Sequence, residues 1–173
     1  MLAIHLLSLL GCNPAPEPCT EVGNGIGQCA PVLTLPRADG GMWSLSAQTN
    51  RVVLVQLAAS WCGVCQLQAP AHQVLVDEYE SEGFTKATVL KGDADFEPAD
   101  QTDAEAWKAY FELRHPVLYD EDKEVWNRWK RDVNSLPQMF LVDGGGSIRW
   151  RRIGMASDEV LREQIEEQLR HLD

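Results

Sequence analysis

Two cysteines at a short, fixed spacing form the most reactive group in this chain. Cys62 and Cys65 lie in the segment WCGVC, directly after a continuous apolar run at residues 52–57. Such a pair can close a disulfide within one helical turn or open to a dithiol, which makes it a reversible two-electron couple. The apolar run predicts a buried strand, so Cys62 should begin a helix, where free N–H groups and the helix dipole stabilise a thiolate. We expect Cys62 to attack and the more buried Cys65 to resolve.

Other uses of a cysteine pair fit this sequence less well. A purely structural disulfide rarely needs a junction between a strand and a helix. A zinc site needs further ligands, but Cys19 and Cys29 have the wrong spacing and the four histidines are scattered. A c-type haem site has His directly after the second cysteine, where this chain has Gln66. The pair therefore favours redox chemistry, with no metal and no organic cofactor.

The other three of the five cysteines lie near the N-terminus. Residues 1–12, MLAIHLLSLLGC, are almost wholly apolar and lack an early Lys or Arg. They are too few for a membrane span of about 20 residues, and LLGC resembles a bacterial lipobox. We interpret them as a secretory signal that ends at a lipid-bearing Cys12, and an ordinary or truncated signal is the alternative. Cys19 and Cys29 can pair outside the cytoplasm, while two free thiols remain the alternative.

Composition and charge limit the remaining possibilities. Residues 13–31 are rich in Pro and Gly without apolar periodicity, which predicts a flexible tether before a single domain at residues 32–173. The chain has 26 acidic and 15 basic residues and a formal charge of −11. Nucleic acid is therefore not an expected partner, because phosphate binding needs a basic face.

Strand and helix patterns alternate along the predicted domain. Residues 32–45 predict a β-hairpin, and residues 87–90 predict a strand that completes a βαβ unit. The helix after the cysteines carries an apolar set at helical spacing: Leu67, Val74, Leu75 and Tyr79. Further predicted elements are a helix opened by a capping box at residues 102–105, a strand at 117–119, a helix at 125–130, strands at 138–142 and 147–153, and a helix capped by Ser157. The predicted class is α/β with a mixed sheet.

Several of these segments resemble one known family. WCGVCQLQAP resembles the active-site segment of the thioredoxin superfamily, including Pro70 five residues after the second cysteine. Over residues 32–170 the chain resembles the membrane-tethered TlpA and ResA branch. LTLPRADGGMWSL resembles its N-terminal hairpin, residues 85–133 its inserted helix and strand, and SLPQMFLVDGGGSIRWRRIG its cis-proline segment and last hairpin.

The resemblance implies a fold, a function and partners. The fold would be thioredoxin-like, with a mixed central sheet flanked by helices, an N-terminal β-hairpin and an inserted helix and strand. The function would be an extracytoplasmic thiol–disulfide oxidoreductase that acts on protein thiols and disulfides. Electrons would come from a membrane-embedded thiol donor, the lipid would hold the chain on the membrane, and we expect a monomer.

The resemblance also implies roles for residues near the cysteines. Pro137 would be cis, and the backbone of Leu136 would pair with an extended substrate beside Cys62. Trp61 would shield the couple from water. Gln56 and Gln68 stand where many relatives carry Asp or Glu, and both should come near the Cys65 sulfur. An amide cannot take a proton, so this chain should lack the usual acid–base group.

Two rival functions and one candidate ion site remain. A peroxiredoxin-type peroxidase would have a Thr-x-x-Cys context, which the Ser60-Trp61-Cys62 segment does not provide. A non-catalytic binding module would keep the fold only for contacts. Acidic residues gather at residues 93–103, but their spacing does not match an EF-hand loop, so a solvated insertion is the better interpretation.

Overall fold

A five-stranded mixed sheet forms the centre of the molecule. The computed structural model describes residues 17–131 and 133–172, so the predicted signal and Cys12 lie outside the described residues. The strands, in the order β5-β4-β3-β6-β7, are β5 (Val117–Tyr119), β4 (Phe84–Leu90), β3 (Val52–Ala58), β6 (Gln138–Val142) and β7 (Ile148–Ile153). β3, β4 and β5 run parallel, while β6 and β7 continue the sheet antiparallel. The predicted thioredoxin-like α/β fold is confirmed.

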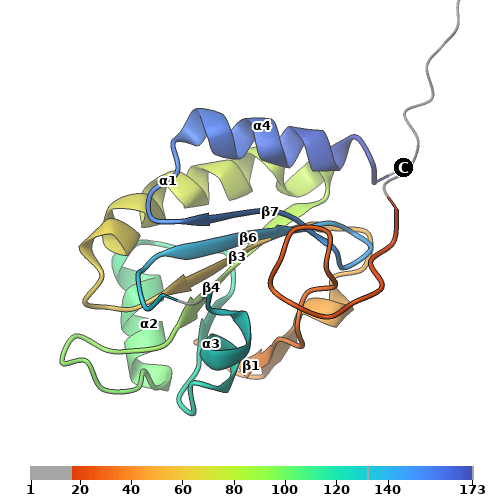
Figure 1. Ribbon diagram of the computed structural model, residues 1–173. Helices are drawn as coiled ribbons and strands as arrows, with labels where there is room; N and C mark the ends of the chain where they lie inside the picture. The colour runs from red at the N-terminus through yellow and green to blue at the C-terminus, as the bar shows by residue number, and fades with distance from the viewer. Residues whose placement is uncertain (1–16, 132, 173) are drawn as a thin grey trace, which may run out of the picture.

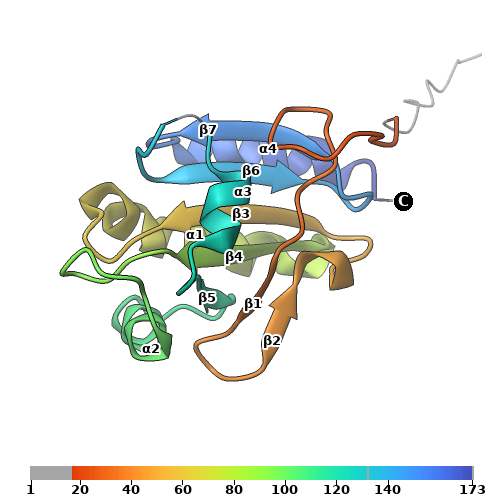
Figure 2. The same cartoon turned by 60° about the horizontal axis from the view of Figure 1, so that its bottom comes forward.

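Helices and a hairpin cover both faces of this sheet (Figure 1). One face carries α1 (Gly63–Tyr79) and α4 (Asp158–Leu169). The other face carries α3 (Glu124–Trp129) and a hairpin of β1 (Thr34–Pro36) and β2 (Met42–Ser44). Two short 3-10 turns are η1 (Leu45–Ala47) and η2 (Glu80–Glu82). α2 (Gln101–Tyr110) lies beside β5 at the sheet edge (Figure 2).

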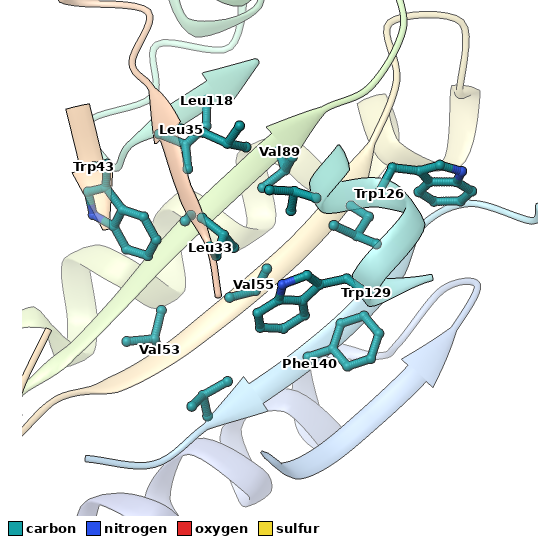
Figure 3. Close-up of a cluster of buried hydrophobic side chains, with 14 of the residues drawn as sticks. Leu33, Leu35, Trp43, Val53, Val55, Val89, Leu118, Trp126, Trp129 and Phe140 are labelled. Carbon is teal, nitrogen blue, oxygen red and sulfur yellow. The ribbon is translucent and has the colours of Figure 1, made fainter. Parts of the chain in front are cut away.

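Each face of the sheet buries its own apolar cluster, because side chains alternate along a strand. Every residue of β3 is buried, as the continuous apolar run predicts. Val53 and Val55 point to the hairpin and α3, where Trp129 and Phe140 pack with ring centroids 5.2 Å apart (Figure 3). A third cluster surrounds the two cysteines where β3 ends.

The helix predicted after the cysteines is confirmed, although Leu67 and Val74 are exposed and the buried side of α1 includes the polar residues Gln68, His72 and Gln73. One local prediction is wrong in detail. The capping box of α2 is formed by Asp100 and Asp103, so the helix begins before the predicted segment 102–105.

Residues 17–31, the described part of the predicted tether, are bonded to the domain. Ile148 at the start of the edge strand β7 exchanges backbone hydrogen bonds with this segment: its N–H donates to the Gln28 carbonyl (2.9 Å), and its carbonyl accepts from Gly27 (2.8 Å). The Asn24 amide donates to the Lys130 carbonyl at 2.9 Å. The segment thus covers an edge that would otherwise present unpaired backbone groups. No helix in the described part of the chain is long and apolar enough to cross a membrane.

Candidate active site

Cys62 and Cys65 lie where β3 gives way to α1, and their sulfurs form a disulfide of 2.13 Å. Cys62 is the N-cap of the helix, and its Sγ accepts the backbone N–H of Cys65 at 3.2 Å. A negative charge on this sulfur would meet that N–H and the positive end of the helix dipole. Cys62 is 5% exposed and Cys65 is 0% exposed, so Cys62 is the more accessible of the two.

Trp61 packs against the buried cluster that contains Cys62 and Cys65, and its ring contacts residues that sequence reasoning missed. Its ring stacks on Phe96 with centroids 5.2 Å apart, and Lys91 Nζ lies 5.7 Å from its centroid. Gly92 lies close against this stack, since a Cβ there would lie 3.2 Å from both the Trp61 indole nitrogen and the Glu97 carbonyl. Phe96 is exposed and has a φ of 70°, a backbone conformation that residues other than glycine rarely adopt. Its place in an acidic segment gave no sequence signal of this contact.

The Leu136–Pro137 peptide bond is cis. Leu136 packs against the buried cluster that contains Cys62 and Cys65. The Pro137 carbonyl accepts the N–H of Gly154 at 2.8 Å, which ties this loop to the end of β7. The structure therefore brings the Leu136 segment to the cysteines, as the resemblance implies.

The two glutamines are buried, but neither donates to the Cys65 sulfur. Gln68 Nε2 donates to the Ala156 carbonyl at 2.9 Å, so this side chain links α1 to the segment before α4. Its Oε1 finds no partner among the described residues, and neither does Nε2 of Gln56. Gln68 is three residues beyond Cys65 on the same helix, a spacing that brings side chains together.

A buried polar chain beneath α1 is the largest feature that sequence reasoning missed. Gln73 Nε2 donates to the Asp77 carboxylate (2.6 Å), so its Oε1 accepts Nδ1–H of His115 (3.0 Å). His115 Nε2 is then the acceptor for Lys86 Nζ at 3.2 Å. Lys86 also donates to Thr88 Oγ1 at 2.5 Å. The chain therefore runs from a buried ammonium to a surface carboxylate.

Burial controls the ionisation of the side chains in this hydrogen-bonded series. It lowers the pKa of Lys86 from 10.5 to about 7. Burial also lowers the pKa of His115 and of His72 well below the ordinary value, and the charge of Lys86 adds to both effects. Neither ring nitrogen of His72 has a partner among the described residues. His72 lies on α1, Lys86 on β4 and His115 in the segment before β5. They are far apart in the sequence, and only the fold brings them together.

The acidic segment before α2 binds its own backbone. Asp93 Oδ1 accepts the N–H groups of Asp95 and Glu97 at 2.9 and 2.8 Å. Among the described residues, no three His, Cys, Asp or Glu side chains lie close enough together to hold a metal ion.

Comparison with known proteins gives concordant results. The model of the AhpC/TSA family matches residues 26–151. The chain is 25% identical to the thiol-disulfide oxidoreductase ResA of Geobacillus thermodenitrificans over 96% of its own length and 91% of that protein. It is 26% identical to the thioredoxin-like protein YneN of Bacillus subtilis, over 84% and 82% of the two chains.

Solved structures give the same picture. A putative thiol:disulfide interchange protein DsbE from Chlorobium tepidum superimposes with a TM-score of 0.71 at 27% identity, covering 82% of this chain and 95% of the other. A putative protein disulfide isomerase from Bacteroides thetaiotaomicron has a TM-score of 0.74 at 22% identity, covering 87% and 95%. The second similarity concerns the fold alone.

Proposed function

The chain belongs to the AhpC/TSA family and is a thiol–disulfide oxidoreductase of the ResA and DsbE type, and we propose that it reduces or exchanges protein disulfides outside the cytoplasm. The observation that carries the proposal is the N-cap position of Cys62, whose sulfur already accepts a helix N–H. A thiolate at that position needs no separate cationic partner.

The reaction follows from the order of the two sulfurs. In the reductive direction the Cys62 thiolate attacks one sulfur of a substrate disulfide, and the other leaves as a thiolate that takes a proton from solvent. Cys65 then loses its proton and attacks the Cys62 sulfur. The second substrate thiol departs, and the pair is left as the disulfide seen here. Two electrons pass to the substrate, and a thiol donor, which we propose is membrane-embedded, must return them.

Residues around the pair have positioning roles in this scheme. Leu136, held beside the cysteine cluster by the loop of Pro137, would offer its backbone to an extended substrate. Trp61, stacked on Phe96, would exclude water from the mixed disulfide.

A reduction assay tests the proposal. The wild type should speed reduction of insulin by dithiothreitol, and Cys62→Ser should fall to the background rate because the attacking sulfur is gone. Reduced Cys65→Ser, mixed with insulin after the dithiothreitol has been removed, should accumulate a mixed disulfide on Cys62 that is visible on a non-reducing gel, because the resolving thiol is gone. A peroxidase would instead consume hydrogen peroxide with Cys62 alone, and a binding module would reduce nothing. Either result would contradict the proposal.

The proposed location depends on the first twelve residues. The LLGC segment supports a lipid on Cys12, and the Cys19–Cys29 disulfide suits an oxidising compartment. Protein expressed in bacteria with residues 1–12 included should partition with membranes and incorporate labelled palmitate, and Cys12→Ala should lose both. The variant should still reduce insulin. An unlabelled wild type in the soluble fraction would remove the anchor from the proposal and leave the oxidoreductase.

A further inference from the structure

A cavity of about 460 Å³ opens between α2 and the segment around the start of α1. Its lining residues are Ser60, Gln66, Ala94, Asp103, Ala106, Trp107, Tyr110 and Phe111. Ser60 and Gln66 flank the two cysteines in sequence, and Gln66 Nε2 donates to the Ser60 carbonyl at 2.6 Å. Trp107 belongs to the same buried cluster as Cys62 and Cys65. A side chain bound in the cavity would therefore lie against residues that neighbour the two cysteines in the sequence and in the buried cluster.

Aromatic rings form one wall of this cavity. Phe111 packs against Trp107 and against Tyr110, with ring centroids 4.8 Å apart in both pairs. Tyr110 is 81% exposed although it adjoins this cluster, so its ring is open to a partner. Trp107 is only 5% exposed, and its indole N–H has no acceptor among the described residues. The ring of Tyr110 is therefore the aromatic face that is open to a ligand.

The charge of the cavity has one sign. Asp103 is the only charged residue of the lining. Burial raises the pKa of Asp103, and the carboxylates of Asp100 and Asp93 also act in that direction. A cation in the cavity would relieve this repulsion. Lys91 lies over the rings of Trp61 and Trp126 and is not part of the lining.

We infer that this cavity is a substrate subsite that takes a Lys or Arg side chain located close to the disulfide of a target polypeptide. Aromatic faces and a carboxylate together recognise a cationic side chain through cation–π attraction and a charge-assisted hydrogen bond. Asp103 Oδ2 already accepts the N–H of Asp100 in the capping box of α2, but an apolar ligand would leave its charge unbalanced and an acidic ligand would be repelled. The inference rests on the proposed reaction and names the kind of substrate that it selects.

Matched peptides test the subsite. Two short peptides with the same internal disulfide would differ only in one residue beside a cysteine, Lys in one and Glu in the other. Single-turnover reduction by the reduced protein should be faster for the Lys peptide by roughly tenfold at low ionic strength. Added salt should shrink the difference, since the charges are partly exposed.

Variants of the lining give the controls. Asp103→Asn keeps an oxygen that can accept the N–H of Asp100 in the capping box, and it should lower the Lys-to-Glu rate ratio several-fold. Tyr110→Ala should also lower it, while Tyr110→Phe should keep most of it. Glu105→Gln removes the same charge from the same helix outside the lining, so the ratio should stay unchanged.

The outcomes separate the inference from the function on which it rests. A wild type that reduces both peptides at equal rates would overturn the subsite and leave the oxidoreductase intact. A ratio that Asp103→Asn and Glu105→Gln lower equally would mean that overall charge sets the preference, which would also overturn the subsite. Reduction of neither peptide would overturn the proposed function, and the inference with it.

Discussion

At the scale of single residues, the contact of Gln68 decides how Cys65 can lose its proton. The Gln68 Nε2 donates a hydrogen bond to the Ala156 carbonyl. Its Oε1, which has no partner among the described residues, can accept a hydrogen bond but cannot take a proton. Cys65 is fully buried behind Cys62, so bulk solvent does not reach it directly in the disulfide state. A carboxyl group at this position would change both the chemistry and the link to α4.

We expect Gln68→Glu to speed resolution of a mixed disulfide trapped on Cys62. Burial should raise the pKa of the new carboxyl, and its ionised form accepts a proton that an amide cannot. The gain should be roughly tenfold and should grow as the pH rises through that pKa. Stopped-flow rates against pH measure it, with Gln68→Met as the control that has no acid group. Superimposable profiles for Gln68→Glu and wild type would show that Cys65 already has another proton acceptor.

The same substitution should affect stability in a pH-dependent way. A protonated carboxyl can donate to the Ala156 carbonyl as the amide does, whereas an ionised one cannot. The folded pKa is raised, so stability should fall as the pH rises from about 4.3 towards that pKa, by about 1–3 kcal/mol. Denaturant unfolding at several pH values measures this loss.

At the scale of elements, local patterns predicted most of the sheet. The buried run of β3, the position of β5 and the hairpin of β6 and β7 agree with the sequence because each depends on its own residues. The docking of residues 17–31 on β7 was not predictable from composition, because Gly and Pro only mark the lack of a regular element. The buried polar face of α1 was missed for a similar reason, since its partners come from β4 and from the segment before β5.

The Cys19–Cys29 disulfide should stabilise this docked segment. It closes a loop with a sequence separation of 10, and chain-entropy estimates give roughly 2–3 kcal/mol for such a loop. The double variant Cys19→Ser with Cys29→Ser should lose about that much free energy of unfolding in denaturant titration. It should keep the wild-type rate of insulin reduction, because the segment lies on β7 and not at the start of α1. A large loss of activity would instead connect this disulfide to catalysis.

At the scale of the whole molecule, the buried Lys86 makes stability depend on pH. Its folded pKa of about 7 lies below the ordinary value of 10.5, so between these values the unfolded chain holds more protons than the folded one. Stability from this group therefore rises as the pH increases from 7 to 10.5. Below pH 7 both states are charged, and the cost of burying the charge is constant and largest.

Lys86→Met should accordingly stabilise the protein most below pH 7. The difference in pKa corresponds to roughly 5 kcal/mol, and lost contacts with Thr88 and His115 reduce the expected gain to roughly 2–5 kcal/mol. The gain should shrink towards zero near pH 10.5. Denaturant unfolding of variant and wild type at pH 6, 8 and 10 checks the trend. A gain of equal size at all three values would mean that packing, and not charge, explains it.

If Cys12 carries a lipid, the docked N-terminal segment would also limit how far the enzyme can reach. Four residues would then separate the anchor from Glu17, the first described residue, and the five residue steps from Cys12 to Glu17 span at most about 18 Å when extended. The start of α1 lies towards the opposite end of the sheet from this attachment (Figure 1). The disulfide would therefore face away from the bilayer, and the size of the folded domain, not a long linker, would set its distance from the membrane surface. Its targets would be proteins whose disulfides come within that distance of the membrane.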